Sequence, residues 1–231
     1  MQYASLTLKG PRADNQDSFH LQSSKGLTFA CVADGVGGNS SGCVASKMAV
    51  NKVMEAIDNG AMLSLELFIS IDRTLKQKGA FDKALEGMAS TLSACVVSHN
   101  RLFVGHCGDS RIMLLRNKGI KQLTQDHTEV EKLLNEGVLN KQEALEYPRK
   151  NVLESALGEK KELLYFDGEF EVVAGDRVLL TTDGVHGVFS KKELRDISLQ
   201  SLNPEEFIRN ITTSGLESRI SDNATLIVID I

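Results

Sequence analysis

Proline is scarce in this sequence, and so is every feature that would divide the chain into separate parts. The 231 residues include three prolines, with no low-complexity tract and no glycine- and serine-rich linker. A chain of this length can form one large domain or two small ones, and the lack of a linker favours one domain over residues 1–231. The hydrophobic fraction of 42% excludes a disordered chain.

Long apolar runs are also missing, which bears on where the protein acts. No run approaches the roughly 18 residues that a membrane-spanning helix needs. The first stretch, MQYASLTLKGPR, lacks the basic start and apolar core of a signal peptide. We therefore expect a cytoplasmic protein with no membrane partner. The net charge of −5, from 26 basic and 31 acidic residues, argues against a nucleic-acid partner.

The cysteines lack the spacings of zinc ligands, and no two of them form a CxxC pair. Cys31, Cys43, Cys95 and Cys107 sit among apolar or small residues, as reduced packing thiols of a cytoplasmic protein do. A cysteine-based phosphatase needs Cys and Arg separated by five residues around one phosphate loop. Cys107 and Arg111 are separated by three, so this mechanism is excluded.

Three other motifs of phosphate chemistry are absent. The sequence has no GxxxxGK[ST], and its run GVGGNSSG does not match GxGxxG. Phosphatases of the haloacid-dehalogenase type need Asp-x-Asp after a strand, with the first Asp as nucleophile. Here Val32 and Thr181 stand two residues before Asp34 and Asp183, so that motif is missing as well.

What the sequence does contain is a series of strands with helices inserted in pairs. The expected strands cover 3–8, 17–22, 27–34, 89–97, 102–108, 111–116, 120–124, 164–173, 176–182 and 224–231. The expected helices cover Ser40–Ile57, Ser64–Lys76, Thr128–Asn135, Lys141–Glu146, Lys191–Leu199 and Pro204–Thr213. This order lacks the regular alternation of a parallel sheet. It predicts an α+β fold with antiparallel sheets and helices packed on their faces.

One stretch, TFACVADGVGGN at 28–39, runs a buried-looking strand into Asp34 and then into three glycines within four residues. Glycine lets backbone approach another group closely, and an acid there is costly to bury unless it is paired or holds a cation. The form Asp-Gly-Val-x-Gly recurs after the strand that precedes Asp183. Asp17, Asp109 and Asp222 also lie at predicted strand ends, where an isolated Asp is more often a turn or cap residue.

Carboxylates that converge repel one another, so they need cations between them. Oxygen ligands of this kind suit Mg²⁺ or Mn²⁺. Two such ions about 3.5–4 Å apart can share a water, lower its pKa and clamp the oxygens of a phosphoryl group. Arg12, a few residues before Asp17, is the candidate for the remaining phosphate oxygens, because its planar fork matches phosphate geometry.

These residues belong to six short motifs that follow one another along the chain. They are RADNQD (12–17), VADGVGG (32–38), GHCGDSR (105–111), LTQDHT (123–128), LTTDGVHG (180–187) and SDNAT (221–225). In this order, and over the whole chain, the sequence resembles the metal-dependent protein serine/threonine phosphatases of type 2C in their short bacterial form. The resemblance implies a sandwich of two antiparallel β-sheets flanked by pairs of α-helices, with metals at one end between the sheets. The implied reaction is hydrolysis of phosphoserine and phosphothreonine monoesters.

The resemblance also assigns the metal ligands. It implies two tightly bound ions, Mn²⁺ or Mg²⁺, and a third that binds more weakly. Asp34 matches the residue that bridges the two tight ions, and the Gly35 carbonyl matches a ligand of one of them. Asp183 and Asp222 complete that set.

Three further assignments come from the family. Asp17 matches an acid that positions metal-bound water, and Asp109 matches the acid that holds the third metal. Arg12 matches the arginine that binds phosphate. Residues 129–165 fall where the family places a flap beside the site.

Two departures leave parts of the mechanism unassigned. Some family members use a His after the first Asp-Gly as general acid, but Val36 stands there, so the proton donor to the leaving group is open, with metal-bound water as one candidate. Gln16 replaces a Glu of many relatives, so a metal contact there would be weaker and made through water. We expect His20, His99 and His106 to be structural, whereas His127 and His186 lie inside motifs without an assigned role.

A second hypothesis belongs to a different class. A relative of the same fold could be catalytically weak and act by binding phosphoproteins or regulating a partner. Such a protein would be expected to lose one or more metal acids, whereas this chain keeps all five and Arg12, which favours the enzyme. The expected partners are a phosphorylated protein substrate and, by family analogy, a serine/threonine kinase. The expected state is a monomer.

Overall fold

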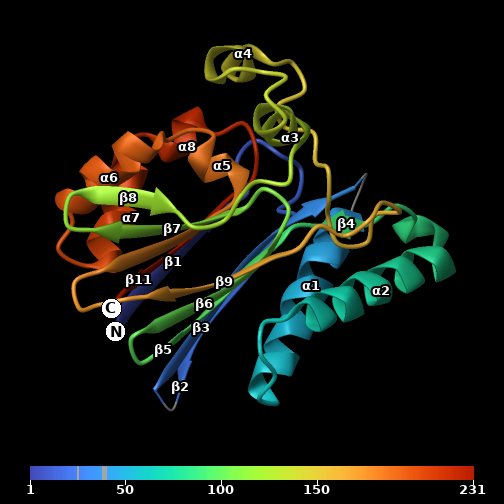
Figure 1. The fold of residues 1–231 in the computed structure, drawn as a ribbon, viewed down its shortest axis with the longest axis horizontal. Coiled ribbons are helices and arrows are strands. Elements are labelled where there is room, and N and C mark those ends of the chain that lie inside the picture. Colours follow the sequence, from blue (N-terminus) through green and yellow to red (C-terminus); the bar gives the residue numbers. More distant parts are fainter. Residues whose placement is uncertain (25, 38–40) are drawn as a thin grey trace.

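Two antiparallel β-sheets packed face to face form the centre of the protein, and helices cover the outer face of each (Figure 1). The computed structural model describes residues 1–24, 26–37 and 41–231. One sheet has the strand order β1-β11-β10-β7-β8, and the other has the order β2-β3-β5-β6-β9 with β4 paired to β3. Among the described residues, no helix is both long and apolar enough to cross a bilayer.

The chain passes from one sheet to the other several times along its length. The first sheet contains β1 (Gln2–Leu8), β7 (Arg111–Arg116), β8 (Gly119–Gln122), β10 (Arg177–Thr181) and β11 (Ala224–Asp230). The second contains β2 (Asp17–Ser24), β3 (Leu27–Val36), β4 (Ala89–Ser90), β5 (Leu92–Ser98), β6 (Arg101–Cys107) and β9 (Phe166–Glu171). The predicted strands 164–173 and 176–182 therefore belong to different sheets, and the turn between them crosses from one sheet to the other.

Helices pack on the sheets in two groups. The second sheet is covered by α1 (Ser41–Asp58) and α2 (Leu65–Phe81), followed by the short 3-10 helix η1 (Lys83–Leu85). The first sheet is covered by α5 (Asp183–His186), α6 (Lys191–Leu199), α7 (Pro204–Thr213) and α8 (Leu216–Arg219). The remaining helices, α3 (Glu129–Asn135) and α4 (Lys141–Glu146), stand away from both sheets (Figure 1).

Three apolar layers result from this stacking, and β3 shows why. Phe29, Cys31 and Ala33 pack against α1 and α2, whereas Ala30 and Val32 face the other sheet. A strand with both faces buried reads as a continuous apolar run, which is the pattern that the sequence has there. The core thus fixes β3 between two layers and carries its last residues to one end of the sandwich.

Several element boundaries differ from the predictions. Strand β3 continues through Asp34 to Val36 instead of ending at the acid, because Gly35 and Val36 pair with β4. The predicted strand 89–97 is two strands, β4 and β5. Helix α2 ends at Phe81 instead of at 76. The predicted helix start at 40 and the end of the first glycine motif lie outside the described residues.

Candidate active site

The strand pairing brings the predicted acids to one end of the sandwich. Asp17 and Asp34 are direct partners in the antiparallel register of β2 and β3. Asp183 is the first residue of α5, directly after β10, and Asp222 lies two residues before β11, the neighbour of β10. Asp109 precedes β7, which pairs with β10 on its other side. Five acids from separate parts of the chain therefore share one edge.

Asp34 lies at the electrostatic centre of this group. Burial raises the pKa of its carboxyl well above the ordinary value, and the negative charges of the other four acids raise it further. Its backbone is held from the side of β4. The Thr91 hydroxyl accepts a hydrogen bond from the Asp34 N–H at 2.8 Å, and the Thr91 N–H donates to the Asp34 carbonyl at 2.9 Å.

Asp17 is buried beside it, and one of its two oxygens accepts a strong hydrogen bond from a side chain. Its Oδ2 accepts a hydrogen bond from the Thr182 hydroxyl at 2.8 Å. Within the described residues, its buried Oδ1 has no hydrogen-bond partner. Burial raises the pKa of Asp17 to about 7, against hydrogen bonds from Thr225 and Thr182 that lower it. A buried carboxylate oxygen without a donor calls for a cation.

Asp183 and Asp109 have the same character. Burial raises the pKa of Asp183, and the charge of Asp222 adds to this rise. The Asp183 Oδ1 atom is also buried without a hydrogen bond from any described residue. Burial raises the pKa of Asp109 to about 7, with contributions from the charges of Asp183 and Asp126, whereas Arg111 lowers it.

Asp222 is paired with Arg12, the predicted phosphate ligand. The Arg12 Nη2 atom lies 2.5 Å from the Asp222 Oδ2 atom, and the Arg12 side chain is 57% exposed. An exposed ion pair of this kind adds little to stability. It does keep the guanidinium at the edge of the acid group, where it can reach a phosphate.

Glycine at position 35 is required by the approach of three backbone segments. A Cβ atom there would lie 2.1 Å from the Gly42 carbonyl oxygen and 2.8 Å from the Gln16 carbonyl oxygen. The Gly35 N–H donates to the Gln16 carbonyl at 3.1 Å. Only glycine fits this contact, which places the start of α1 directly beside the acids.

The donor set fits hard divalent cations. Five carboxylates, two of them with a buried oxygen that receives no hydrogen bond from the described residues, match the oxygen ligands that Mg²⁺ and Mn²⁺ prefer. In the described part of the chain, no three His, Cys, Asp or Glu side chains form a ready-made group around one ion. The acids act on one another through their charges, and their side chains would have to turn toward a shared ion.

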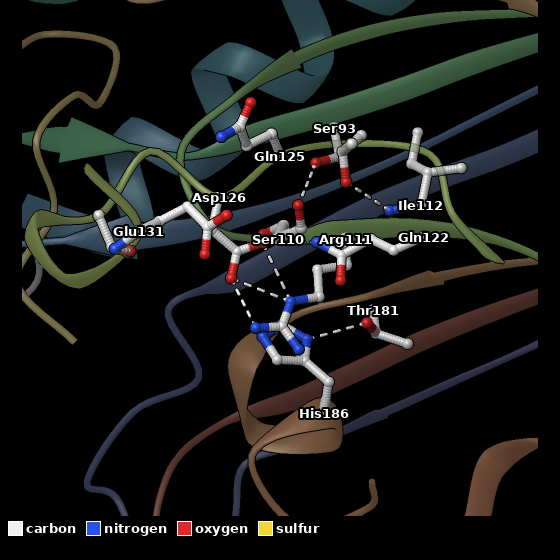
Figure 2. Close-up of polar contacts among 12 residues, drawn as sticks. Ser93, Ser110, Arg111, Ile112, Gln122, Gln125, Asp126, Glu131, Thr181 and His186 are labelled. Carbon is white, nitrogen blue, oxygen red and sulfur yellow. Dashed lines mark hydrogen bonds and ion pairs between the residues drawn. The ribbon is translucent and has the colours of Figure 1, made fainter. Parts of the chain in front are cut away.

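Sequence reasoning missed an ion pair that borders the acids. Arg111 binds Asp126 through two nitrogens, with distances of 3.0 Å from Nε and 2.5 Å from Nη2 (Figure 2). The Gln122 amide adds a hydrogen bond to Asp126 at 2.8 Å. Both charged residues lie in quoted motifs, GHCGDSR and LTQDHT, but only the fold shows that these motifs meet.

A second residue that was missed, Asn223, fixes the loop that carries Arg12. Its side-chain amide donates to the carbonyls of Lys9 at 2.7 Å and Asp14 at 3.0 Å. Its Oδ1 atom accepts from the Gln16 N–H at 2.8 Å. Asn223 follows Asp222 in SDNAT, and its place directly before the predicted last strand was the available signal.

The histidines hold structure around the site. His106 is buried and bonded to Ser93 and to the Gln125 carbonyl, and burial lowers its pKa to about 3. Burial lowers the pKa of His186 well below 6.5, and its ring is bonded to Thr181 at 3.0 Å (Figure 2). Burial lowers the pKa of His127 to about 4. All three are therefore neutral at pH 7.

Two cavities of similar size lie in different regions. The larger, about 420 Å³, is lined by Leu115, Arg177 and Leu202 among others, at the end of β10 opposite the acids. It contains none of the predicted site residues, and Arg177 is paired there with Asp230 at 2.6 Å. The other, about 390 Å³, lies beside Asp126 and His127 and extends along α3. The chemistry belongs with the acids and not with the larger cavity.

Known proteins match the whole arrangement. The family model described as protein phosphatase 2C matches residues 12–219. The serine/threonine phosphatase stp of Listeria welshimeri is 35% identical over 214 residues, which cover 86% of this chain and 82% of that protein.

Two solved structures share the fold and a similar level of identity. A crystal structure of the Mycobacterium tuberculosis serine/threonine phosphatase PstP/Ppp superposes with a TM-score of 0.85 at 31% identity, covering 100% of this chain and 98% of that one. A structure of the PstP catalytic domain in complex with two manganese ions gives a TM-score of 0.82 at 31% identity, covering 99% and 97%.

These matches confirm the expected sandwich fold and the expected class of enzyme, a hydrolase that acts as a protein serine/threonine phosphatase. They leave the roles of individual residues as predictions. Since the family model spans most of the sequence, the chain belongs to the protein phosphatase 2C family.

Proposed function

We propose that this protein hydrolyses phosphoserine and phosphothreonine in proteins, with two divalent cations held by the acids at the end of the sandwich. The observation that carries the proposal is the buried oxygens of Asp17 and Asp183, which no hydrogen bond from a described residue satisfies. The manganese ions of the PstP relative support Mn²⁺ or Mg²⁺ as the cations.

We assign the metal ligands by residue. Asp34 and the Gly35 carbonyl would hold the two tight ions, with Asp183, Asp222 and Asp17 completing that set. Asp109 would hold a third, weaker ion. When bound, such cations lower the pKa of a shared water and neutralise phosphate oxygens.

The chain's own groups then act on substrate and water. Arg12, exposed at the edge of the acids, binds the phosphate oxygens through its planar fork. Asp17, fixed by the Thr182 hydroxyl, would direct its other oxygen toward the metal site and orient the attacking water there. Attack forms a new P–O bond, the bond from phosphorus to the serine or threonine oxygen breaks, and that oxygen takes up a proton. Val36 cannot give this proton, so we place its source beside Asp109.

The segment 129–165 is proposed as a flap that contacts the protein part of the substrate. Helices α3 and α4 stand away from the sheets (Figure 1), and the segment joins the site at its base, where His127 is hydrogen-bonded to Gly108 beside Asp109. The segment has exposed apolar side chains that are available to a partner chain, with exposed fractions of 62% for Val138 and 71% for Leu145. With this flap, residues 1–231 form the single catalytic domain of the proposal.

The surroundings of the enzyme are also part of the proposal. Substrates are phosphorylated proteins, and a serine/threonine kinase that phosphorylates the same targets is the expected partner, on family analogy alone. Free cysteines support a reducing compartment, the cytoplasm, where the protein acts in signalling as a monomer.

The test is turnover of p-nitrophenyl phosphate and of a phosphothreonine peptide, each with Mn²⁺ and with a chelator. We expect hydrolysis of both substrates that stops on chelation and returns when Mn²⁺ is added back. Asp34→Asn, prepared in the same way, controls for a contaminating phosphatase. Full turnover after exhaustive chelation would overturn the metal mechanism. Binding of the phosphopeptide without turnover would favour the regulatory relative.

A further inference from the structure

The dipeptide Asp126–His127 forms hydrogen bonds to both sides of the turn that contains Asp109. The His127 N–H donates to the Gly108 carbonyl at 2.7 Å, and the Gly108 N–H donates to the His127 Nδ1 atom at 3.1 Å. The pair is reciprocal, with a ring nitrogen in place of one carbonyl. Since Nδ1 accepts a hydrogen bond, the ring proton of His127 is on Nε2.

Asp126 grips the same turn from its other side. Its carboxylate binds the Arg111 guanidinium through both nitrogens that face it (Figure 2). Asp109 therefore lies between Gly108, held by His127, and Arg111, held by Asp126. Two adjacent residues of one segment thus bracket the acid of another.

Gly108 has no side chain, so the turn is held by hydrogen bonds to its backbone, such as those of His127. The φ of +107° at Gly108 is a conformation that favours glycine, and a Cβ there would lie 2.6 Å from the Thr91 Cβ atom. No other residue fits at position 108, so the direction in which Asp109 leaves the turn is fixed by what binds the Gly108 backbone.

The gripping segment also forms the base of the flap. The His127 carbonyl accepts from the Glu154 N–H at 2.8 Å, and the Glu129 N–H donates to the Val152 carbonyl at 2.9 Å. His127 thus lies between the Gly108 turn on one side and residues 152–154, where segment 129–165 returns to its base, on the other. His127 therefore connects the base of that segment to the turn by hydrogen bonds on both sides.

We propose that His127 is a positioning residue, which clamps the Gly108–Asp109 turn to the base of the flap so that the position of the flap sets the position of Asp109. The inference rests on the proposed function for its effect on catalysis, but the clamp itself is a property of the fold. His127 touches neither substrate nor metal in this scheme and acts only through Gly108.

The test compares two variants of nearly equal size. His127→Asn keeps an acceptor, because the Asn Oδ1 atom is as many bonds from Cα as the His Nδ1 atom. His127→Leu puts a methyl group there and leaves the Gly108 N–H without a partner. His99→Asn, in the exposed turn between β5 and β6, controls for the loss of a histidine.

Three measurements are made on the full chain. Hydrogen exchange followed by mass spectrometry reports on peptides covering 105–112 and 128–136. Calorimetry with Mn²⁺ reports on tight metal binding, and steady-state kinetics on a phosphothreonine peptide and on p-nitrophenyl phosphate give kcat and KM.

We expect His127→Leu to speed exchange in both peptides by about tenfold, the effect of leaving a buried N–H unpaired. The kcat on phosphopeptide should fall by about tenfold or more, with tight Mn²⁺ binding unchanged, since Asp34 and Asp183 are not disturbed. His127→Asn should restore exchange and kcat to within about threefold of the parent, and His99→Asn should match the parent.

Unchanged exchange in 105–112 for His127→Leu would overturn the clamp. The same holds if His127→Asn is as impaired as His127→Leu, or if exchange rises uniformly along the chain with a lower melting temperature, which is the signature of a merely structural residue. If the parent hydrolyses neither substrate, the proposed function fails, and the exchange comparison between the two variants still decides the clamp.

Discussion

Asp34 lowers the stability of the metal-free protein. Its folded-state pKa lies well above 3.8, so the folded chain holds a proton at a pH where the unfolded chain has released it. The contribution of Asp34 to stability is therefore present below pH 4 and is lost as pH rises toward its folded pKa. Asp17 and Asp109, with pKa values raised to about 7, contribute to stability with the same pH dependence.

Removing the charge at position 34 should therefore stabilise the protein while it abolishes catalysis. In a chelator at pH 8, we expect Asp34→Asn to melt about 2–10 °C above the parent, because about 1–3 kcal/mol of the cost of burying this charge beside other acids is removed. At pH 4.5 the difference in melting temperature should shrink. The buried histidines affect both proteins equally, so their titration does not contribute to this difference. With Mn²⁺, kcat should fall by at least about a thousandfold, or roughly 4 kcal/mol of barrier. Calorimetric melting and turnover check both parts, and a variant that melts lower at pH 8 would contradict the repulsion.

Arg12 should matter for substrate capture and little for stability. Arg12→Ala removes a charged hydrogen bond to phosphate, so we expect about 1.5–3 kcal/mol of weaker binding, visible in kcat/KM. Arg12→Lys keeps the charge without the fork and should recover part of this loss. The melting temperature of Arg12→Ala should stay near that of the parent, because the Arg12–Asp222 pair is exposed. Unchanged kinetics on phosphopeptide would assign the phosphate to another cation.

Substitution of Asp109 distinguishes a catalytic role of this residue from a purely structural role in the turn. As a turn residue it would cost about 1 kcal/mol of stability on substitution by Ala, with chemistry unchanged. In the proposed role, Asp109→Ala keeps the two tight ions but loses kcat on phosphopeptide by about ten- to a thousandfold, near the range of general acid catalysis. The loss should be smaller on p-nitrophenyl phosphate, whose leaving group barely needs a proton. Equal losses on both substrates would count against a role in protonation.

At the scale of elements, Asn223 joins the first loop to the last strand. Its amide is the only group identified in the described residues that bonds Lys9, Asp14 and Gln16 at once. We expect Asn223→Ala to lower stability by about 1–3 kcal/mol, because buried backbone groups lose their partners. The loop that carries Arg12 should loosen, so KM for phosphopeptide should rise more than kcat falls. Hydrogen exchange at 9–16 and steady-state kinetics measure this, and normal exchange there would refute the tie.

The sequence predicted the long, periodic elements and missed those defined by distant partners. Helix α5 has four residues, too few for a helical period, so Asp183 looked like the end of a strand. The break between β4 and β5 depends on Thr91, whose hydroxyl and N–H bind Asp34 fifty-seven residues earlier. Helix α5 is too short, and the partner of Thr91 too distant in the sequence, for hydrophobic periodicity in a short window to predict either feature.

The same limit applies to the site. Each acid stood out because it followed or preceded an apolar run. The partners that hold the acids did not stand out: Thr182 on Asp17 and Asp126 on Arg111 are ordinary polar residues until the sheets bring them together. The motifs marked the segments of interest, and only the fold showed which of them meet and through which contacts.

At the scale of the molecule, the three-layer core shields most thiols. Burial raises the pKa of Cys95 and Cys107 to about 12 and that of Cys31 further, whereas Cys43 is partly exposed. A small alkylating agent at pH 7.5 should therefore modify only Cys43 quickly and leave turnover nearly intact. Cys43→Ser should abolish the fast phase in mass spectrometry. Rapid inactivation from which substrate protects would reopen a cysteine mechanism.

The pairing of β1 with β11 joins residues from the two ends of the sequence, with Gln2 opposite Asp230 and Leu8 opposite Ala224. A contact across so many residues closes late in folding, because the loop entropy has to be overcome first. On the ribosome, β1 is synthesised before β11, which is its pairing strand in the described part of the chain, so β1 stays unpaired until β11 leaves the exit tunnel. The newly made chain therefore carries β1 unpaired while the segments from β2 to β10 are made, and pulse-labelled exchange should find β1 among the last segments to gain protection.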